Sequence, residues 1–392
     1  DSTKLVEDFL HYVLIAKPDL AEASGNALFD SGITDEQLAT IVSENDLDDK
    51  VERALRRGRN MEGAGPVVMQ FERSLEEGRL NLSRNQDRIK KSIEMLTGTM
   101  RAQMLGKRRL VEAGEYAVPQ LLEVIKAGNN PELELACTNV LEEIKRFAVL
   151  PLCAAMGDLA PEIQVKVCRI LSAIGWPTAI PYLLDLSQTK TASKEVRDAA
   201  SLAFRRLGGT STDTSAAFAA LARKFFDEEQ SLVAYPSDPT NIVWSYETHS
   251  GLIGTSVPTE IYSQIMAMKT ARMALDLEPS NRTALALYVA ADLRRENQLA
   301  SGQVDPFAAD SRYSPQFFAT ASGVDIARSV LAMAIDKSDT ALVRDAIEAL
   351  GKTEGSGAMF NSGGRQPLLE CLRYPDRRVQ YDAALVLGFR LR

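Results

Sequence analysis

Apolar residues recur three and four positions apart over much of the chain, and this spacing predicts amphipathic helices. It is clearest in the segment 163–174 and is repeated in the segments 133–144 and 196–207. Each of these segments follows another apolar stretch that contains a proline, and the prolines are Pro119, Pro151 and Pro181. Proline is tolerated in the first turn of a helix because its missing N–H would have no partner there. The pattern therefore predicts units of two helices, each about 30–33 residues long, with the proline in the first turn of the first helix.

Glycines support this division, because Gly175 and Gly208 follow two of the second helices, where a left-handed residue ends a helix. The pattern returns near the C-terminus at 343–351 and 382–388, and a proline-started segment at 367–372 precedes the last helix.

The openings of the type Ala-Val-Pro-x-Leu-Leu at 117–122 and the closing helices of the type Val-Arg-x-Ala-Ala at 196–200 resemble HEAT repeats of the short form common in bacterial proteins. The resemblance covers 102–209 and 323–392. It implies an all-α fold, an α-α superhelix. It also implies that Arg197 and Arg344, each followed by an aspartate, belong to an Asp–Arg ladder between neighbouring repeats. The alternative is that both arginines contact a partner on the concave face.

The region between these two blocks has a different pattern. Helices over 267–277 and 283–297, separated by Leu-Glu-Pro-Ser-Asn, resemble part of a tetratricopeptide repeat. Residues 231–258 interrupt the helical spacing with prolines and alternating apolar positions, which predicts an extended insertion or a short hairpin. Segments 301–322 and 353–366 are rich in Gly, Ser and Pro, and we expect loops there.

In the first 110 residues the apolar positions predict helices, but the pattern is less regular than in the repeats. We expect helices around 5–13 and 18–31, one that starts at Thr34, one from about Val67 after a break at 63–66, and one over 84–105. The chain thus divides into an N-terminal helical region (1–110), HEAT-like repeats (111–209), the insertion with tetratricopeptide-like helices (210–322) and C-terminal HEAT-like repeats (323–392).

Composition narrows the classes of protein. The 392 residues are 45% hydrophobic but only 6% aromatic, which suits helices packed on helices. The formal net charge of −8 argues against a dedicated DNA-binding protein. No apolar run is long enough to predict a membrane span. The chain begins at Asp1, which leaves open both a cytoplasmic protein and one exported after removal of a leader. Three of the four cysteines lie in apolar helical segments, which predicts buried thiols.

Candidate chemistry is sparse. The sequence has two histidines, His11 and His249, and no phosphate-binding loop, zinc-protease or nucleophile-elbow motif, so we predict no catalytic residue, metal or cofactor. His249 lies in the irregular insertion with Trp244 and Tyr246, and these three are candidate binding residues. The alternative for Trp244 is that it fastens the insertion to the helices.

A basic segment is the main electrostatic feature, and it is a candidate for binding a polyanion. Its members are Arg84, Arg88, Lys90, Lys91, Arg101, Lys107, Arg108 and Arg109. No aromatic residue lies between them, which disfavours single-stranded nucleic acid. The alternative is a solvated helix face that pairs with acidic neighbours.

An array of paired helices offers a long surface rather than an enclosed reaction chamber. We therefore predict a non-enzymatic scaffold or adaptor that binds a protein or peptide partner on the concave face formed by the second helices. One alternative is a nucleic-acid or polyanion-binding module that uses residues 84–109. Another is the non-catalytic part of a larger enzyme, since HEAT-like repeats occur in bilin lyases and Arg392 directly follows a repeat helix. Partner and oligomeric state stay open.

Overall fold

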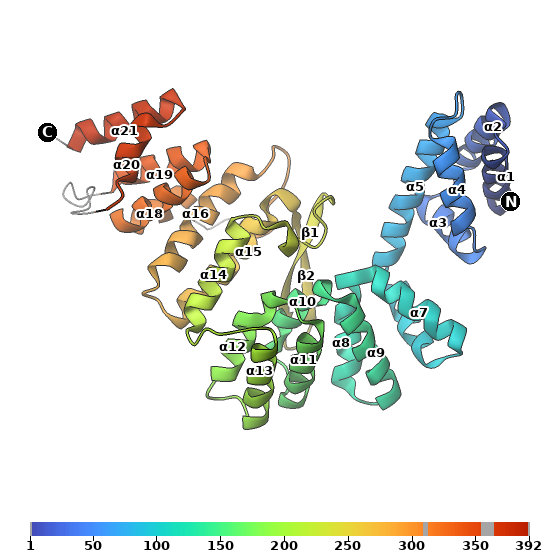
Figure 1. Cartoon of the computed structure of the whole chain (residues 1–392), viewed down its shortest axis with the longest axis horizontal. Helices are drawn as coiled ribbons and strands as arrows, with labels where there is room; N and C mark the ends of the chain where they lie inside the picture. Colours follow the sequence, from blue (N-terminus) through green and yellow to red (C-terminus); the bar gives the residue numbers. More distant parts are fainter. Residues whose placement is uncertain (1, 309–312, 354–363, 391–392) are drawn as a thin grey trace. The chain divides into compact units, whose positions relative to one another are not determined.

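A computed structural model describes residues 2–308, 313–353 and 364–390 (Figure 1), with side chains described as far as Gly388. The described chain is helical apart from its loops and one β-hairpin, which confirms the predicted all-α repeat fold with a short insertion. It forms two compact units, Asp1–Ile144 and Lys145–Arg392, which we describe separately. None of the described helices is both long and apolar enough to cross a membrane.

The first half of unit 1 is a cluster of five helices around one apolar core. These are α1 (Ser2–Leu14), α2 (Pro18–Asp30), α3 (Asp35–Glu44), α4 (Asp48–Gly58) and α5 (Gly65–Arg84). Phe9 and Phe71 meet at its centre with ring centroids 4.9 Å apart. The predicted start at Thr34 is confirmed by a capping box, in which the Thr34 hydroxyl accepts from the Gln37 amide and the Gln37 side chain accepts from the Thr34 amide.

The second half of unit 1 corrects one prediction, because the helix expected over 84–105 is two helices. The elements are α6 (Gln86–Glu94), η1 (Met95–Thr97), α7 (Met100–Ala113), η2 (Gly114–Ala117), α8 (Val118–Ala127) and α9 (Pro131–Ile144). Asn85 caps α6 and Thr99 caps α7, each through its side-chain oxygen. Such caps satisfy backbone N–H groups that a continuous helix would bond internally, so the chain turns at Gly98 instead.

Unit 2 continues with helix pairs. Its first part comprises α10 (Arg146–Met156), α11 (Pro161–Ile174), η3 (Pro177–Ala179), α12 (Ile180–Gln188), α13 (Lys194–Arg206), α14 (Thr214–Phe226) and η4 (Gln230–Leu232). Gly175 has φ +72° and Gly208 has φ +81°, as expected of residues that end helices. Pro181 lies in the first turn of α12 as expected, but Pro151 lies inside α10, so the expectation of a first-turn proline is wrong there. That helix starts five residues earlier, at Arg146.

The insertion is the predicted short hairpin. Strand β1 (Thr240–Glu247) pairs antiparallel with β2 (Gly251–Pro258), and Trp244 lies opposite Gly254. A Cβ atom added at Gly254 would lie 3.1 Å from the Trp244 ring, so the glycine leaves room for the indole. β1 packs against α10 and α15, which places the hairpin among the helices of unit 2.

The rest of unit 2 resumes the helical pattern. Its elements are α15 (Thr259–Leu277), α16 (Arg282–Gln298), α17 (Pro315–Ala321), α18 (Val324–Asp336), α19 (Thr340–Lys352), α20 (Pro367–Glu370), η6 (Cys371–Arg373) and α21 (Arg377–Arg390). The helix pair expected over 267–297 is α15 with α16. The loop expected over 301–322 is wrong in part, because Ser314 caps the short helix α17. Most of the loop expected over 353–366 lies outside the described residues.

Candidate functional site

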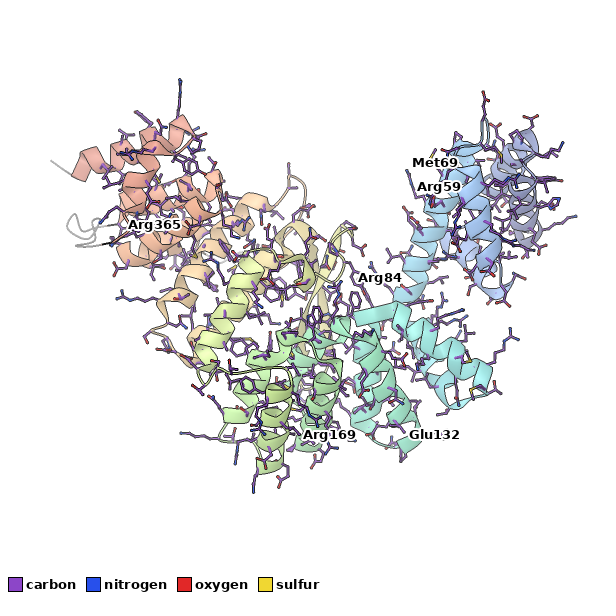
Figure 2. All side chains as sticks on the ribbon, in the orientation of Figure 1. Arg59, Met69, Arg84, Glu132, Arg169 and Arg365 are labelled. Atoms are coloured by element: carbon purple, nitrogen blue, oxygen red, sulfur yellow. The ribbon has the colours of Figure 1, made fainter. Side chains whose placement is uncertain are left out.

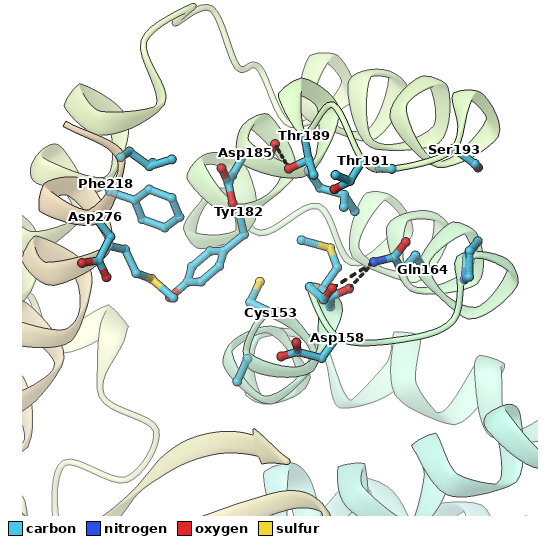
Figure 3. Close-up of a pocket in the computed structure, with 18 residues that line it drawn as sticks. Cys153, Asp158, Gln164, Tyr182, Asp185, Thr189, Thr191, Ser193, Phe218 and Asp276 are labelled. Atoms are coloured by element: carbon cyan, nitrogen blue, oxygen red, sulfur yellow. Dashed lines mark hydrogen bonds between the residues drawn. The ribbon is translucent and has the colours of Figure 1, made fainter. Parts of the chain in front are cut away.

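A pocket of about 490 Å³ with several acidic side chains is the best-defined candidate site in unit 2 (Figure 3). It lies where the C-terminal ends of α10, α12 and α15 come together, beside the turn after α10 and the loop after α12. Polar lining residues include Asp158, Asp185, Asp276 and Gln164, and the rings of Tyr182 and Phe218 form an apolar wall. We call this site the acidic pocket.

Helix ends give the acidic pocket a negative potential before any side chain is counted. A helix C-terminus carries a partial negative charge of about half an electron on its unpaired carbonyls. Three such ends line the pocket, against two N-termini, that of α11 at Pro161 and that of α13 at its cap residue Ser193. Some carbonyls are already satisfied, because the buried Gln164 amide donates to Met156 O at 3.0 Å and to Gly157 O at 3.3 Å. These two bonds, dashed in Figure 3, fix the turn that carries Asp158.

Three carboxyl groups add full charges to this potential. Asp276 is paired with Arg272 on its own helix, at 2.8 Å between Oδ1 and Nε. Asp158 is exposed, and Asp185 is half-buried in the last turn of α12. Neither side chain makes an ion pair or hydrogen bond within the described parts of the chain. Burial raises the pKa of Asp185. The described lining contains no Lys, Arg or His, so the acidic pocket favours a cation.

The wall of the acidic pocket is apolar and holds two buried ionisable groups. The rings of Tyr182 and Phe218 meet edge to face with centroids 5.1 Å apart. Burial raises the pKa of the Tyr182 phenol, and burial also raises the pKa of the Cys153 thiol well beyond its usual range, with Cys168 adding to the effect. Both groups therefore stay protonated at neutral pH, and the thiol is not activated as a nucleophile.

Arg197, predicted from the sequence, lies behind the acidic pocket rather than in it. Its guanidinium donates to the carbonyl of Ala192, which lines the pocket in the loop before α13. The same loop is fixed by Ser193, whose hydroxyl accepts from the Val196 amide at 3.3 Å. Arg197 thus holds the loop, and within the described parts of the chain it makes no ion pair with a neighbouring repeat.

Arg344 fits the ladder expected of neighbouring repeats. Its Nε atom lies 3.6 Å from an oxygen of Asp382, which joins α19 to α21. The adjacent Asp345 accepts a hydrogen bond of 2.6 Å from the Asn297 amide on α16. These contacts join α19 to α21 and to α16 within unit 2.

The three candidates in the insertion do not converge on a site. Trp244 is only 6% exposed, and its carbonyl accepts from the Lys269 ammonium on α15. Its position matches the alternative expectation that it fastens the hairpin to the helices. Tyr246 is half-buried, His249 is exposed at the hairpin turn, and neither lines the acidic pocket. The other histidine, His11, is exposed on α1.

The side chains of the basic segment in unit 1 lie in different environments. The Arg84 guanidinium, at the end of α5 (Figure 2), lies 4.7 Å from the centroid of the Tyr116 ring. Lys107 is paired with Glu143, and the exposed Arg101 lies 3.9 Å from Asp46. Lys90 and Lys91 are exposed. The remaining three, Arg88, Arg108 and Arg109, line a separate pocket of unit 1.

Sequence reasoning missed the residues of the acidic pocket. A weak signal existed, since Asp158, Asp185 and Asp276 all lie in or just after the last turn of a helix. A carboxylate is disfavoured there by the helix dipole. Acids at this end of a helix were therefore the one pattern that could have drawn attention to these three positions. Among the residues described, no group of three or more His, Cys, Asp or Glu side chains could hold a metal ion.

Comparison with known proteins gives only a coarse result. No model of a protein family matches the sequence, and a search of curated proteins finds no match. One similar solved structure is human deoxyhypusine hydroxylase in complex with glycerol, with 17% identity and a TM-score of 0.26 over 80% of this chain and 99% of that one. Another is a circular tandem repeat protein with a novel repeat topology and enhanced subunit contact surfaces. It has 12% identity and a TM-score of 0.21 over 99% of this chain and 82% of that one. At these scores neither likeness bears on function.

Proposed function

We propose that this chain is a non-enzymatic scaffold or adaptor that holds a protein or peptide partner, and that the acidic pocket takes a lysine or arginine side chain of that partner. The observation that carries the proposal is the unpaired, half-buried carboxylate of Asp185 among three helix C-termini, with no cation in the described lining. An entering ammonium or guanidinium group would supply the missing counter-charge.

The two parts of the acidic pocket suit the two parts of such a side chain. Lysine and arginine carry an apolar stem below the charged group, and the stem packs well on apolar surface. Tyr182 and Phe218 offer that surface, while Asp185 and Asp158 offer oxygens. A volume of about 490 Å³ is larger than one side chain requires, so neighbouring residues of the partner fit as well. Charge-assisted hydrogen bonds of this kind contribute about 1.5–3 kcal/mol each.

The position of the acidic pocket changes where we expect the partner to bind. The sequence favoured the face formed by the second helices. The pocket lies at the ends of the first helices α10 and α12 and at the turns that follow them. We therefore place the proposed contact on this edge. The protonated states of Tyr182 and Cys153 support a binding role over a catalytic one.

Binding of short labelled peptides tests the proposal. The probes are heptapeptides with a central Lys, Arg or Gln in the same Ser/Leu background, measured by fluorescence anisotropy at low salt. We expect the Lys and Arg peptides to bind and the Gln peptide to bind at least tenfold more weakly. In Asp185→Asn the preference for Lys and Arg should fall about tenfold, which corresponds to about 1.4 kcal/mol.

The matched control is Asp198→Asn, which removes an exposed carboxylate on α13 of the same unit. It should bind the peptides as the wild type does, although both variants change the net charge equally. Equal binding of the Lys and Gln peptides, or equal losses in the two variants, would overturn the proposal.

A further inference from the structure

The pocket of unit 1 that takes up part of the basic segment has a different chemistry from the acidic pocket. Its volume is about 590 Å³, and it lies among α3, α5, α6 and α7. Arg88 reaches it from α6, and Arg108 and Arg109 reach it from α7. We call these three residues the arginine cluster. Arg79 of α5 also lines it, and its charge is already met by Asp48 at 2.6 Å.

Two members of the arginine cluster lack partners. Arg88 is half-buried, and its guanidinium makes no ion pair or hydrogen bond to any residue that the structure describes. Arg109 is half-buried as well, and its Nε atom is shielded from solvent without a hydrogen-bond acceptor. A shielded N–H group without an acceptor costs about 1–3 kcal/mol. The described chain therefore leaves donors in this pocket unsatisfied.

The charges of the arginine cluster also repel one another. Burial lowers the pKa of Arg88, and the nearby charge of Arg109 lowers this pKa further, followed by a smaller effect of Arg108. Glu112 and Glu44 act in the opposite direction, but they do not outweigh these effects. Glu112 is an exposed residue 3.9 Å from Arg108.

The remaining acid in the lining, Glu76, is exposed at the rim, where it is well solvated. The acids therefore leave Arg88 and Arg109 without a close partner.

The hydroxyl groups of the pocket narrow the class of ligand. Two of the three serine hydroxyls in the lining are already engaged, since Ser83 donates to Leu80 O at 2.7 Å and Ser92 donates to Arg88 O at 2.8 Å. The donors left for a ligand are then the guanidinium N–H groups and the hydroxyl of Ser43. A ligand that only accepts hydrogen bonds and carries negative charge satisfies them, and guanidinium forks match phosphate oxygens in pairs.

We propose that Arg88, Arg108 and Arg109 form a binding pocket for a phosphomonoester group. Phosphate fits better than a single carboxylate because it offers two charges and three oxygens to three guanidinium groups. An extended nucleic-acid backbone fits less well, since Arg84 and Lys107 of the same segment are engaged by Tyr116 and Glu143. The group belongs either to a small phosphorylated molecule or to a phosphorylated side chain of another protein.

Titration of the full chain with simple phosphates tests this inference by calorimetry at matched ionic strength. The probes are inorganic phosphate, phenyl phosphate, a phosphoserine tripeptide and acetate. We expect the phosphates to bind and acetate to bind at least tenfold more weakly. Arg88→Gln and Arg109→Gln should each weaken phosphate binding at least tenfold. Arg57→Gln, an exposed arginine on α4 of the same unit, should bind as the wild type does.

A measurement on the wild-type protein tests the inference even if the variants fold poorly. Phosphate that binds only the folded chain should raise the melting temperature of the wild type, and acetate should not. Tighter binding of the phosphoserine peptide than of phenyl phosphate would identify a protein ligand, and the reverse order a small molecule. Equal binding of phosphate and acetate, unchanged binding in Arg88→Gln and Arg109→Gln, or tighter binding of a DNA or RNA duplex would overturn the inference.

Discussion

At the scale of single residues, buried ionisable groups show which charges the fold tolerates. All four cysteines are buried, which confirms the burial predicted for the three that lie in apolar helical segments. Burial raises the pKa of Cys137 and Cys168 to about 12, and that of Cys371 to about 11. Because the thiolate is the reactive form, none of these groups is activated in the folded chain.

Thiol labelling therefore reports folding at every cysteine. With a disulfide reagent at pH 8, we expect the native protein to react slowly and the urea-unfolded protein to release four equivalents at once. The measurement is the absorbance of the released thiolate over time. Rapid release of one or more equivalents from the native protein would contradict the burial of these thiols.

Asp185 is a residue whose ionisation should destabilise the folded chain. Its pKa is raised by burial, so the folded state favours the protonated form. The contribution of this group to stability is complete below the unfolded pKa of about 4, and it is lost as the pH rises through the higher folded pKa. Asparagine has no charge to bury.

The effect of replacing Asp185 should therefore depend on pH. The free energy of unfolding of Asp185→Asn, minus that of the wild type, should be larger at pH 7.5 than at pH 3.5. Urea denaturation at the two pH values measures this difference. A difference that does not change with pH, while Asp198→Asn behaves the same way, would mean that Asp185 ionises freely in the folded chain.

At the scale of elements, the sequence predicts helices well and their interruptions poorly. The second helices of the three repeats between 111 and 209 agree with the prediction to within two residues, because their apolar spacing directly reflects the buried face. The two closing segments at 343–351 and 382–388 are shorter than the helices α19 and α21 that contain them. The break between α6 and α7 was missed, since Gly98 and Thr99 are a weak signal within a segment whose other residues suit a continuous helix. Cap geometry decides such breaks, and a cap depends on the φ and ψ of one residue.

Close packing of α7 against α6 depends on Gly106. A Cβ atom added there would lie 2.6 Å from the Ser92 carbonyl oxygen and 3.0 Å from the Met95 Cβ atom. Gly106→Ala should therefore push the helices apart and destabilise the protein by about 1–3 kcal/mol. Arg109 is three residues away on α7, so phosphate binding should weaken with it.

Gly388→Ala in α21 is the matched control. It adds the same methyl group to a helical glycine with open space around it, and it should stabilise the protein by about 0.5–1 kcal/mol. Urea denaturation of the two variants gives both values. Equal changes would show that the contact at Gly106 does not limit the packing.

Arg294 on α16 connects this helix to the end of α14 and to the start of α19. The side chain is 14% exposed, and its guanidinium donates to Phe226 O at 2.8 Å at the end of α14. It also lies 3.0 Å from Asp339, which caps α19, and 3.5 Å from Glu228. Arg294→Ala leaves a mostly buried carboxylate without its cation, and should destabilise unit 2 by about 3 kcal/mol.

Arg272→Ala measures the same change at an exposed pair. Arg272 and Asp276 are both more than 60% exposed and lie one turn apart on α15. Loss of that pair should cost no more than about 0.5 kcal/mol. Thermal unfolding of both variants makes the comparison, and similar losses would show that burial adds nothing at Arg294.

At the scale of the whole molecule, repeats predict the architecture but not the site. The prolines and apolar residues of each repeat lie close together in the sequence, and their spacing recurs from one repeat to the next. The repeats can therefore be recognised without a structure. The acidic pocket is assembled from elements between Cys153 and Leu277, and no local pattern states which helix ends come together. The sequence shows the arginine cluster as part of a basic segment. It does not show which of these arginines lack an acidic partner, because pairing depends on how α6 and α7 pack together.

The division of the chain into units yields the last prediction. The compact units meet at Ile144 and Lys145, whereas the sequence suggested a first boundary at 110. A cut at 110 falls inside α7 and removes its last turn, next to the fully buried Leu110. Fragment 1–110 would also lose α8 and α9, which complete the packing of unit 1.

We therefore expect fragments 1–144 and 145–392 each to be helical and to unfold cooperatively in urea, and fragment 1–110 to unfold at lower urea with a shallower transition. Far-UV circular dichroism measures all three. The slope should fall for 1–110 because less surface becomes exposed when a partly frayed chain unfolds. Fragment 1–144 should also retain phosphate binding, since every residue of the arginine cluster and its pocket lies within it. A sharp, equally stable transition for 1–110 would instead place the boundary where the sequence did. Loss of helical structure in 145–392 would show that unit 2 does not fold without unit 1.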